Sequence, residues 1–175
     1  GIVVDKKYLE DLSKEYHKEL DAIAKRVYKA AGEEFNISSP KQLGDILFDK
    51  LGLEPEKQKK TATGQRSTRE SELEKLRDQH PIIGDILSYR ELSKLLGTYI
   101  DTIPTLLDQE SRLHPTFIQT GTSPGRLGSE NPNVQNIPIK SESGRRIRNA
   151  FVASEGHELV AFDYSQIELR IAALL

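Results

Sequence analysis

The chain of 175 residues contains no cysteine, no methionine and no tryptophan. The absence of cysteine excludes disulfide bonds, zinc-thiolate sites and cysteine nucleophiles, and it fits a reducing compartment. The sequence also lacks a signal peptide and any apolar stretch long enough to span a bilayer, so we expect a soluble, intracellular protein with no membrane partner. Because there is no initiator methionine, we expect Gly1 to be an internal or processed start within a longer protein.

An excess of charge of either sign is also lacking, since the formal net charge is only -2. The basic residues nevertheless gather in two clusters, one from Lys57 to Arg69 and one from Arg145 to Arg148. Local clusters govern phosphate binding more than net charge does, because salt screens distant charges. A charged run is often only a solvated face, so both a phosphate-binding surface and an ordinary surface remain open for these clusters.

Two long segments carry apolar residues at three- and four-residue spacings, which is the period of an amphipathic helix. The first predicts one helix over residues 5–31, with Asp5 as its N-cap and Gly32 as its stop. The second begins at His80-Pro81 and runs to the break at Pro104. Two long helices around a compact insertion predict an antiparallel hairpin arm, although an ordinary helical bundle has the same periodicity.

The insertion between the long helices contains two shorter helical patterns. Ser39 to Gln42 is typical of a capping box with proline at the first helical position, and the helix it begins is expected to end at Gly52. Leu73 and Leu76 mark a second short helix after a polar, basic loop.

After Pro115 the sequence is typical of strands and loops. Residues 116–120 are strand-like, residues 121–144 are rich in turn-forming side chains, and residues 147–153 and 158–163 are strand candidates. The sequence therefore predicts an α+β fold, with a helical subdomain over residues 1–113 and a second subdomain with an antiparallel sheet over residues 114–175.

Asp163 is the first candidate for chemistry. A buried strand that ends in a carboxylate holds a metal-binding aspartate rigidly, whereas an isolated aspartate in this place is more often a helix N-cap or a surface carboxylate. Metal-assisted phosphoryl chemistry needs at least a second carboxylate, and nothing soon after Asp163 supplies one from a second strand. The sequence thus predicts half of a metal site.

Two blocks of sequence resemble the family A DNA polymerases, the bacterial DNA polymerase I group. Asp163-Tyr164-Ser165-Gln166-Ile167-Glu168-Leu169-Arg170 resembles motif A of that family residue for residue. Residues 125–127 (Gly-Arg-Leu) and 131–138 (Asn-Pro-Asn-Val-Gln-Asn-Ile-Pro) resemble its primer-template contact segment, in the matching order and spacing. Residues 31–44 and 60–68 are similar to the thumb of these enzymes. The resemblance implies a helical thumb followed by the first part of a palm.

The resemblance implies a role for each residue of the first block. Asp163 would be catalytic and would bind two magnesium ions in the complete enzyme, and Tyr164 would add its backbone carbonyl to the metal shell. Ser165, Gln166, Ile167 and Glu168 would bind the incoming nucleotide. Hard cations prefer oxygen ligands, which agrees with an aspartate at this position.

Glu168 has two possible roles. Ser165 to Glu168 has the pattern of a capping box, in which the glutamate side chain only returns a hydrogen bond to the helix start. The resemblance implies instead that Glu168 lies under the sugar and excludes a ribose 2′-hydroxyl, which selects deoxynucleotides. We favour this second role. Arg170, on the same helix, is as well explained by a salt bridge within the palm.

The resemblance also implies two sets of DNA contacts. Arg126, Asn133, Gln135 and Asn136 would lie near the minor groove of the primer-template duplex, where hydrogen-bond donors check pair geometry without discriminating sequence. Turn formation explains the asparagines Asn131 and Asn133 equally well. The thumb tip would follow duplex phosphates without specifying bases. Its predicted contacts are Lys60, Thr61, Thr63, Gly64, Arg66, Ser67 and Thr68.

Three positions depart from the family pattern. Gln65-Arg66 stands where a single tyrosine is common, Pro124 replaces a threonine, and Leu174 replaces a histidine. The proline removes a hydroxyl and a backbone donor.

The resulting hypothesis is a part of a DNA-directed DNA polymerase. Its partners would be primer-template DNA and deoxynucleoside triphosphates, and the resemblance implies a monomer in the bacterial cytoplasm, associated with the nucleoid. With one metal-binding aspartate, the chain alone is expected to bind duplex DNA and not to polymerise. The alternative is a non-catalytic duplex-DNA-binding module.

Overall fold

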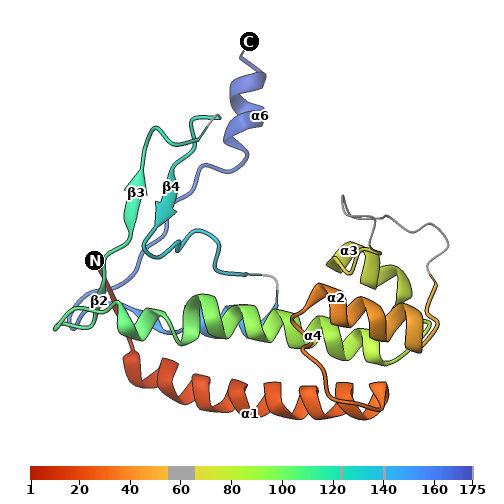
Figure 1. Cartoon of the computed structure of the whole chain (residues 1–175). Coiled ribbons are helices and arrows are strands. Elements are labelled where there is room, and N and C mark those ends of the chain that lie inside the picture. The colour runs from red at the N-terminus through yellow and green to blue at the C-terminus, as the bar shows by residue number, and fades with distance from the viewer. Residues whose placement is uncertain (55–65, 123, 140, 175) are drawn as a thin grey trace.

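The computed structural model describes residues 1–54, 66–122, 124–139 and 141–174. Helices make up most of the chain before residue 106, and short antiparallel strands follow (Figure 1). The predicted α+β class is therefore confirmed.

Helix α1 (Lys6–Ala31) has the ends that the sequence predicts. Asp5 accepts a hydrogen bond from the Tyr8 backbone N–H through Oδ1 at 2.9 Å, which satisfies one of the donors that a helix start leaves unpaired. Gly32 ends the helix at φ 77°, a conformation that glycine adopts without cost.

Helix α4 (Ile82–Leu95) continues through the π-helical segment η3 (Leu96–Ile100) and lies antiparallel to α1 (Figure 1). Arg26 near the end of α1 pairs with Asp85 near the start of α4 at 2.7 Å. At the opposite end of the pair, Ser13 donates to Asp101 at 2.7 Å. The predicted antiparallel arm is confirmed, and its second helix ends slightly before Pro104, which lies in the 3-10 turn η4 (Ile103–Thr105).

The insertion consists of α2 (Pro40–Gly44), η1 (Asp45–Lys50), α3 (Glu70–Leu73) and η2 (Glu74–Leu76). Ser39 Oγ caps the first of these by accepting from the Gln42 N–H at 3.4 Å. The other half of the predicted capping box is wrong, because Gln42 Oε1 accepts from the Asn36 N–H at 2.7 Å. Leu43 and Leu47 are buried here together with Leu73 and Leu76 of the second helical pair, so the insertion shares one core with the arm.

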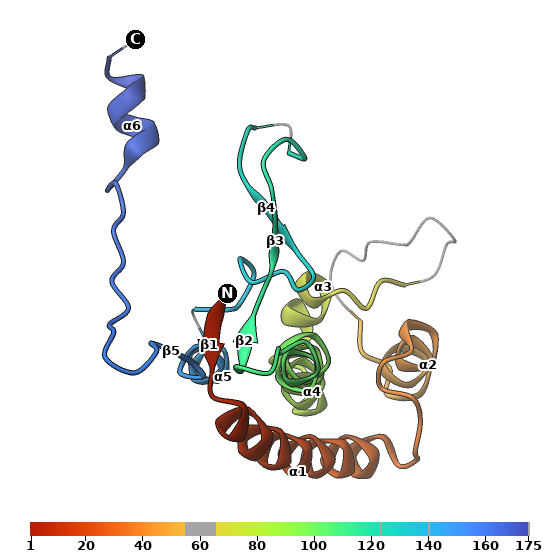
Figure 2. The ribbon, with the colours of Figure 1, turned by 90° about the vertical axis from the view of Figure 1, so that its left-hand side faces the viewer.

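Two small antiparallel sheets complete the fold. Strand β1 (Ile2–Val4) lies between β2 (Arg112–Leu113) and β5 (Phe151–Val152), with Ile2 opposite Leu113 and Val3 opposite Val152. Strands β3 (Thr116–Ile118) and β4 (Gly128–Glu130) form a hairpin that projects away from the helices (Figure 2). The first sheet joins segments on both sides of the predicted subdomain boundary.

One strand prediction holds only in part, and another is wrong. Ile147 and Arg148 end helix α5 (Glu142–Arg148), which Ser141 caps by accepting from the Gly144 N–H at 3.2 Å, so only Phe151 and Val152 of the predicted strand 147–153 are paired. Residues 158–163 are exposed and form no strand with any described residue. A strand needs a neighbouring strand for its hydrogen bonds, and no described segment lies in register with this one. The chain then ends in helix α6 (Ile167–Ala172), which lies apart from the helical core in Figures 1 and 2.

Candidate nucleic-acid and metal site

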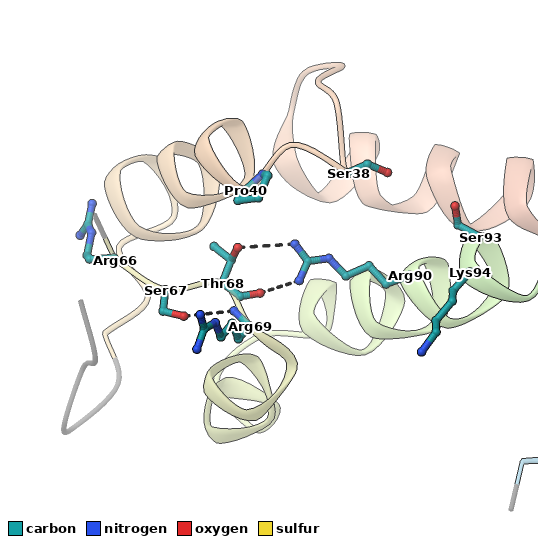
Figure 3. Close-up of a pocket in the computed structure, with 9 residues that line it drawn as sticks. All are labelled: Ser38, Pro40, Arg66, Ser67, Thr68, Arg69, Arg90, Ser93 and Lys94. Atoms are coloured by element: carbon teal, nitrogen blue, oxygen red, sulfur yellow. Dashed lines mark hydrogen bonds between the residues drawn. The ribbon is translucent and has the colours of Figure 1, made fainter. Parts of the chain in front are cut away.

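A basic groove with a volume of about 560 Å³ opens between the insertion and α4 (Figure 3). Its lining combines positively charged side chains with hydroxyl groups, and none of the described lining residues is acidic. The lining residues are Ser38, Pro40, Arg66, Ser67, Thr68, Arg69, Arg90, Ser93 and Lys94. Cations with hydroxyl donors and no carboxylate are the side chains that bind phosphate oxygens.

Arg90 of α4 forms the centre of this groove (Figure 3). Its Nη1 donates to the Thr68 carbonyl oxygen at 2.5 Å and its Nη2 donates to Thr68 Oγ1 at 3.5 Å. The side chain is half-buried, and this burial lowers the pKa of the guanidinium from its usual value. Ser67 and Thr68 are each only 5 % exposed.

Arg66, another lining residue of the groove, is held by side chains of η1. It forms an ion pair with Asp49 of η1, and its guanidinium carbon lies 4.8 Å from the centroid of the Phe48 ring. A phosphate that binds Arg66 would therefore compete with Asp49.

The structure brings three of the predicted thumb-tip contacts together, since Arg66, Ser67 and Thr68 all line the groove. The other predicted contacts of this set lie outside the described residues, namely Lys60, Thr61, Thr63 and Gly64. The sequence prediction missed Arg90, Ser93 and Lys94, which α4 supplies from more than 20 residues along the chain. The only signal was the four-residue spacing of Arg90 and Lys94, which places both on one face of the helix.

The predicted minor-groove residues lie in and directly after the β3–β4 hairpin, and all of them are exposed. Arg126 lies in the hairpin loop, just before β4. Asn133 Oδ1 accepts from the Gln135 N–H at 3.1 Å, so this asparagine forms the turn that was its alternative role. Gln135 and Asn136 present exposed side chains beyond that turn.

The Asp163 block does not form the capping box that was the alternative role of Glu168. Helix α6 begins at Ile167, its N-cap Gln166 has φ 56°, and no described side chain caps this end. Arg170 Nε donates to the Ser165 carbonyl oxygen at 2.8 Å, and this contact holds the first turn together.

Asp163, Tyr164 and Glu168 are all exposed, so the block presents its side chains to solvent. Glu168 Oε1 lies 4.0 Å from Arg126 Nη2, which brings one predicted nucleotide contact beside one predicted DNA contact. Both side chains are more than three-quarters exposed, so the pair contributes little to stability. The basic groove lies elsewhere in the molecule, since helix α4 and the insertion, which line it, lie apart from α6 in Figures 1 and 2.

The oxygen donors at Asp163 suit a hard divalent cation, but they do not complete a site. Throughout the described residues, no three histidine, aspartate or glutamate side chains are close enough together to hold a metal ion. Magnesium binding needs more ligands than Asp163 and one backbone carbonyl provide. No helix in the described ranges is both long and apolar enough to cross a bilayer.

Comparison with known proteins gives three concordant similarities. The chain is 53% identical over 174 residues to DNA polymerase I of Deinococcus radiodurans, and the match covers 99% of the chain and 18% of that protein. It is 51% identical over 176 residues to the thermostable DNA polymerase I of Thermus aquaticus, covering 21% of that protein. The solved POL domain of Pol1 from M. smegmatis, in complex with DNA primer-template and dNTP, aligns with a TM-score of 0.88 and 42% identity over 99% of this chain and 30% of that one.

The chain thus spans about a fifth of the length of these curated relatives. The sequence model of the family described as DNA polymerase family A matches residues 6–175, which is nearly the whole chain. The chain therefore belongs to DNA polymerase family A.

Proposed function

We propose that this chain is the part of a DNA-directed DNA polymerase that binds primer-template DNA and carries the first catalytic carboxylate. The observation that carries the proposal is the joint match of fold and sequence to a polymerase domain solved with DNA primer-template and dNTP. Within this proposal, residues 1–113 are the thumb and residues 114–175 are the first part of the palm.

The basic groove is the proposed contact with duplex phosphates. Arg66, Ser67 and Thr68 keep their predicted role, and Arg69 and Lys94 join them because they line the same groove. Such contacts position the duplex without specifying bases, and each neutralised phosphate makes binding more dependent on salt. Lys60, Thr61, Thr63 and Gly64 remain proposed contacts of the adjoining segment.

The residues in the loop of the β3–β4 hairpin and directly after it are the proposed minor-groove contacts. Exposed side chains of Arg126, Gln135 and Asn136 are donors able to reach purine N3 and pyrimidine O2, which occupy similar positions in every correct pair. Asn133 keeps a proposed DNA contact, and its turn with Gln135 also directs the chain at this point.

The Asp163 block is the proposed nucleotide end of the site. Asp163 and the Tyr164 carbonyl would hold divalent cations, two magnesium ions in the complete enzyme, whose chemistry is to activate the primer hydroxyl and to stabilise the leaving pyrophosphate. Glu168 would exclude a ribose 2′-hydroxyl, beside the nucleotide contacts Ser165, Gln166 and Ile167. Since the described residues supply only part of a metal shell, we expect the remaining ligands to come from the rest of the longer protein.

This assignment predicts that the 175-residue chain binds a primer-template duplex and does not extend the primer. Binding is measured by fluorescence anisotropy as salt rises, and extension is measured with magnesium and all four deoxynucleotides. We expect affinity to fall steeply with salt, and Lys94→Gln to flatten the slope of log K against log salt by about 0.9. The matched control is Lys18→Gln, an exposed lysine of α1 outside the groove.

Two results would contradict the proposal. Primer extension by the short chain would show that its metal shell is complete. Absent or salt-insensitive binding, unchanged by Arg126→Ala and Gln135→Ala, would favour a helical scaffold with no role in DNA binding. The alternative of a non-catalytic duplex-binding module predicts that Asp163→Asn in the longer protein leaves its activity intact. We also propose that the protein is a monomer in the bacterial cytoplasm, because the relatives that it matches are bacterial proteins.

A further inference from the structure

Residues 66–69, here called the strap, form one side of the groove and are hydrogen-bonded to Arg90, a side chain distant in the sequence. The strap is not helical, and its central residues Ser67 and Thr68 are buried. Within it, Ser67 Oγ accepts from the Arg69 N–H at 3.3 Å. Its contact with α4 is made by Arg90, whose two terminal nitrogens donate to two oxygens of Thr68 (Figure 3).

The four cations of the groove differ in how much of their bonding capacity is already used. Arg66 is paired with Asp49, and Arg90 is hydrogen-bonded to Thr68. Arg69 and Lys94 are exposed, and their side chains form no ion pair and no hydrogen bond with a described residue. Their charges are thus available to a ligand, whereas the guanidinium of Arg90 is directed at the protein's own backbone.

We propose that Arg90 is a positioning residue, which holds the strap so that Ser67 and Arg69 line the groove, and that Arg69 and Lys94 bind the duplex phosphates. This inference rests on the proposed function of the groove. The geometry of arginine is what the role requires, because its planar guanidinium spans two oxygens of one residue. A lysine has one nitrogen, and it keeps the charge without forming the same pair of bonds.

The test compares Arg90→Lys with Arg90→Gln in the 175-residue chain, using a labelled primer-template duplex over a series of salt concentrations. We expect both variants to weaken binding about tenfold, because both lose the pair of hydrogen bonds from Arg90 to Thr68. We expect their affinities to agree within about threefold and their salt slopes to be equal, although only one variant keeps the charge. Lys94→Gln, in contrast, should lower the slope by about 0.9.

The outcomes separate the inference from the proposed function. An Arg90→Lys chain that binds nearly as well as the unmodified chain overturns the inference, as does an Arg90→Gln slope about 0.9 below that of Arg90→Lys, since either result makes Arg90 a phosphate ligand. Failure of the unmodified chain to bind duplex overturns the proposed function itself.

Hydrogen exchange provides a second measurement that does not depend on DNA. In the folded variants, we expect Arg90→Lys to speed exchange of the Arg69 amide at least tenfold, because the strap opens more often without its anchor. Lys94→Gln should leave that rate unchanged. Equal protection of the strap in Arg90→Lys and the unmodified chain would overturn the inference. Should Arg90→Lys not fold, Thr68→Ala tests the same bond from the other side, and unchanged exchange and affinity in that variant would also overturn it.

Discussion

Gly144 of α5 lies so close to Pro138 that there is no room for a side chain between them. A Cβ built on Gly144 would lie 2.6 Å from Pro138 Cβ and 2.7 Å from the Pro138 carbonyl oxygen. These distances are too short for real contacts, and one of the opposing atoms belongs to the backbone. Glycine at this position is therefore required by the close approach of two chain segments, in a helix where alanine would otherwise be preferred.

Gly144→Ala is expected to lower the free energy of unfolding by about 1–3 kcal/mol, because the added methyl group forces the backbone at Pro138 to move. The measurement is chemical denaturation followed by circular dichroism. Gly84→Ala in α4 is the matched control, since a Cβ added at Gly84 would meet no neighbouring side chain or segment within 4 Å. That substitution should stabilise the protein by about 0.5–1 kcal/mol. Stabilisation by both substitutions would show that α5 has room to relax.

At the scale of elements, the long helices could be predicted because their signals are local. The spacing of Leu9, Leu12 and Tyr16 repeats along α1, and the cap at Asp5 lies directly before it. Strand β1 could not be predicted in the same way. Strand β1 pairs with residues 112–113 and 151–152, more than 100 residues away, and short-range periodicity contains no information on such partners.

Helix α5 shows the opposite error, in which a local signal was overlooked. Ser141 is a serine N-cap followed by a glutamate, and it begins a helix whose last two residues, Ile147 and Arg148, were predicted as the start of a strand. The basic groove could be predicted from the sequence only in part. Arg66 to Thr68 could be recognised in the sequence, but Arg90 and Lys94 lie on the polar face of a helix, where basic residues are ordinary. Only packing of the insertion against α4 brings them together.

An ion pair on the molecular surface joins helix α5 to α1. Arg146 donates to both carboxylate oxygens of Glu15 at 2.6 Å, and its guanidinium lies 5.2 Å from the centroid of the Tyr16 ring. The hydrogen bonds from Arg146 lower the pKa of Glu15 below its usual value of 4.5, and the same bonds raise the pKa of Arg146. A depressed carboxylate pKa stabilises the folded state at any pH above the unfolded value.

This contribution should disappear in acid. As pH falls through the folded pKa of Glu15, the carboxylate is protonated and the pair is lost, so we expect the melting temperature of the unmodified chain to fall more steeply below about pH 4.5 than that of Glu15→Gln. The variant should be less stable at neutral pH, and the two curves should converge at the acid end. Arg146→Gln removes the same pair from the other side and should flatten the acid limb equally. Parallel curves for all three proteins would mean that the pair does not stabilise the fold.

At the scale of the whole molecule, packing is uneven along the chain. The helical arm and insertion share a continuous core, whereas the segment from Leu159 to Leu174 has no buried residue in the part that the structure describes. Phe162 is 94 % exposed and Leu174 is 87 % exposed. Figure 2 shows this segment leading away from the sheet and ending in α6. Contiguous exposed apolar side chains of this kind mark surfaces that normally contact another surface.

The uneven packing predicts that two apolar substitutions differ greatly in cost. Phe162→Ser should change the free energy of unfolding by less than about 0.5 kcal/mol, because the ring has few contacts to lose. Ile86→Ala, at a fully buried position of α4, should cost about 2–5 kcal/mol because it removes packed atoms and leaves a cavity. Both values are measured by urea denaturation of the 175-residue chain at low protein concentration, where association through the exposed segment is minimised. A loss above about 1 kcal/mol for Phe162→Ser would show that the aromatic ring is packed in solution, and residues 159–174 would then belong to the cooperative fold that the buried core defines.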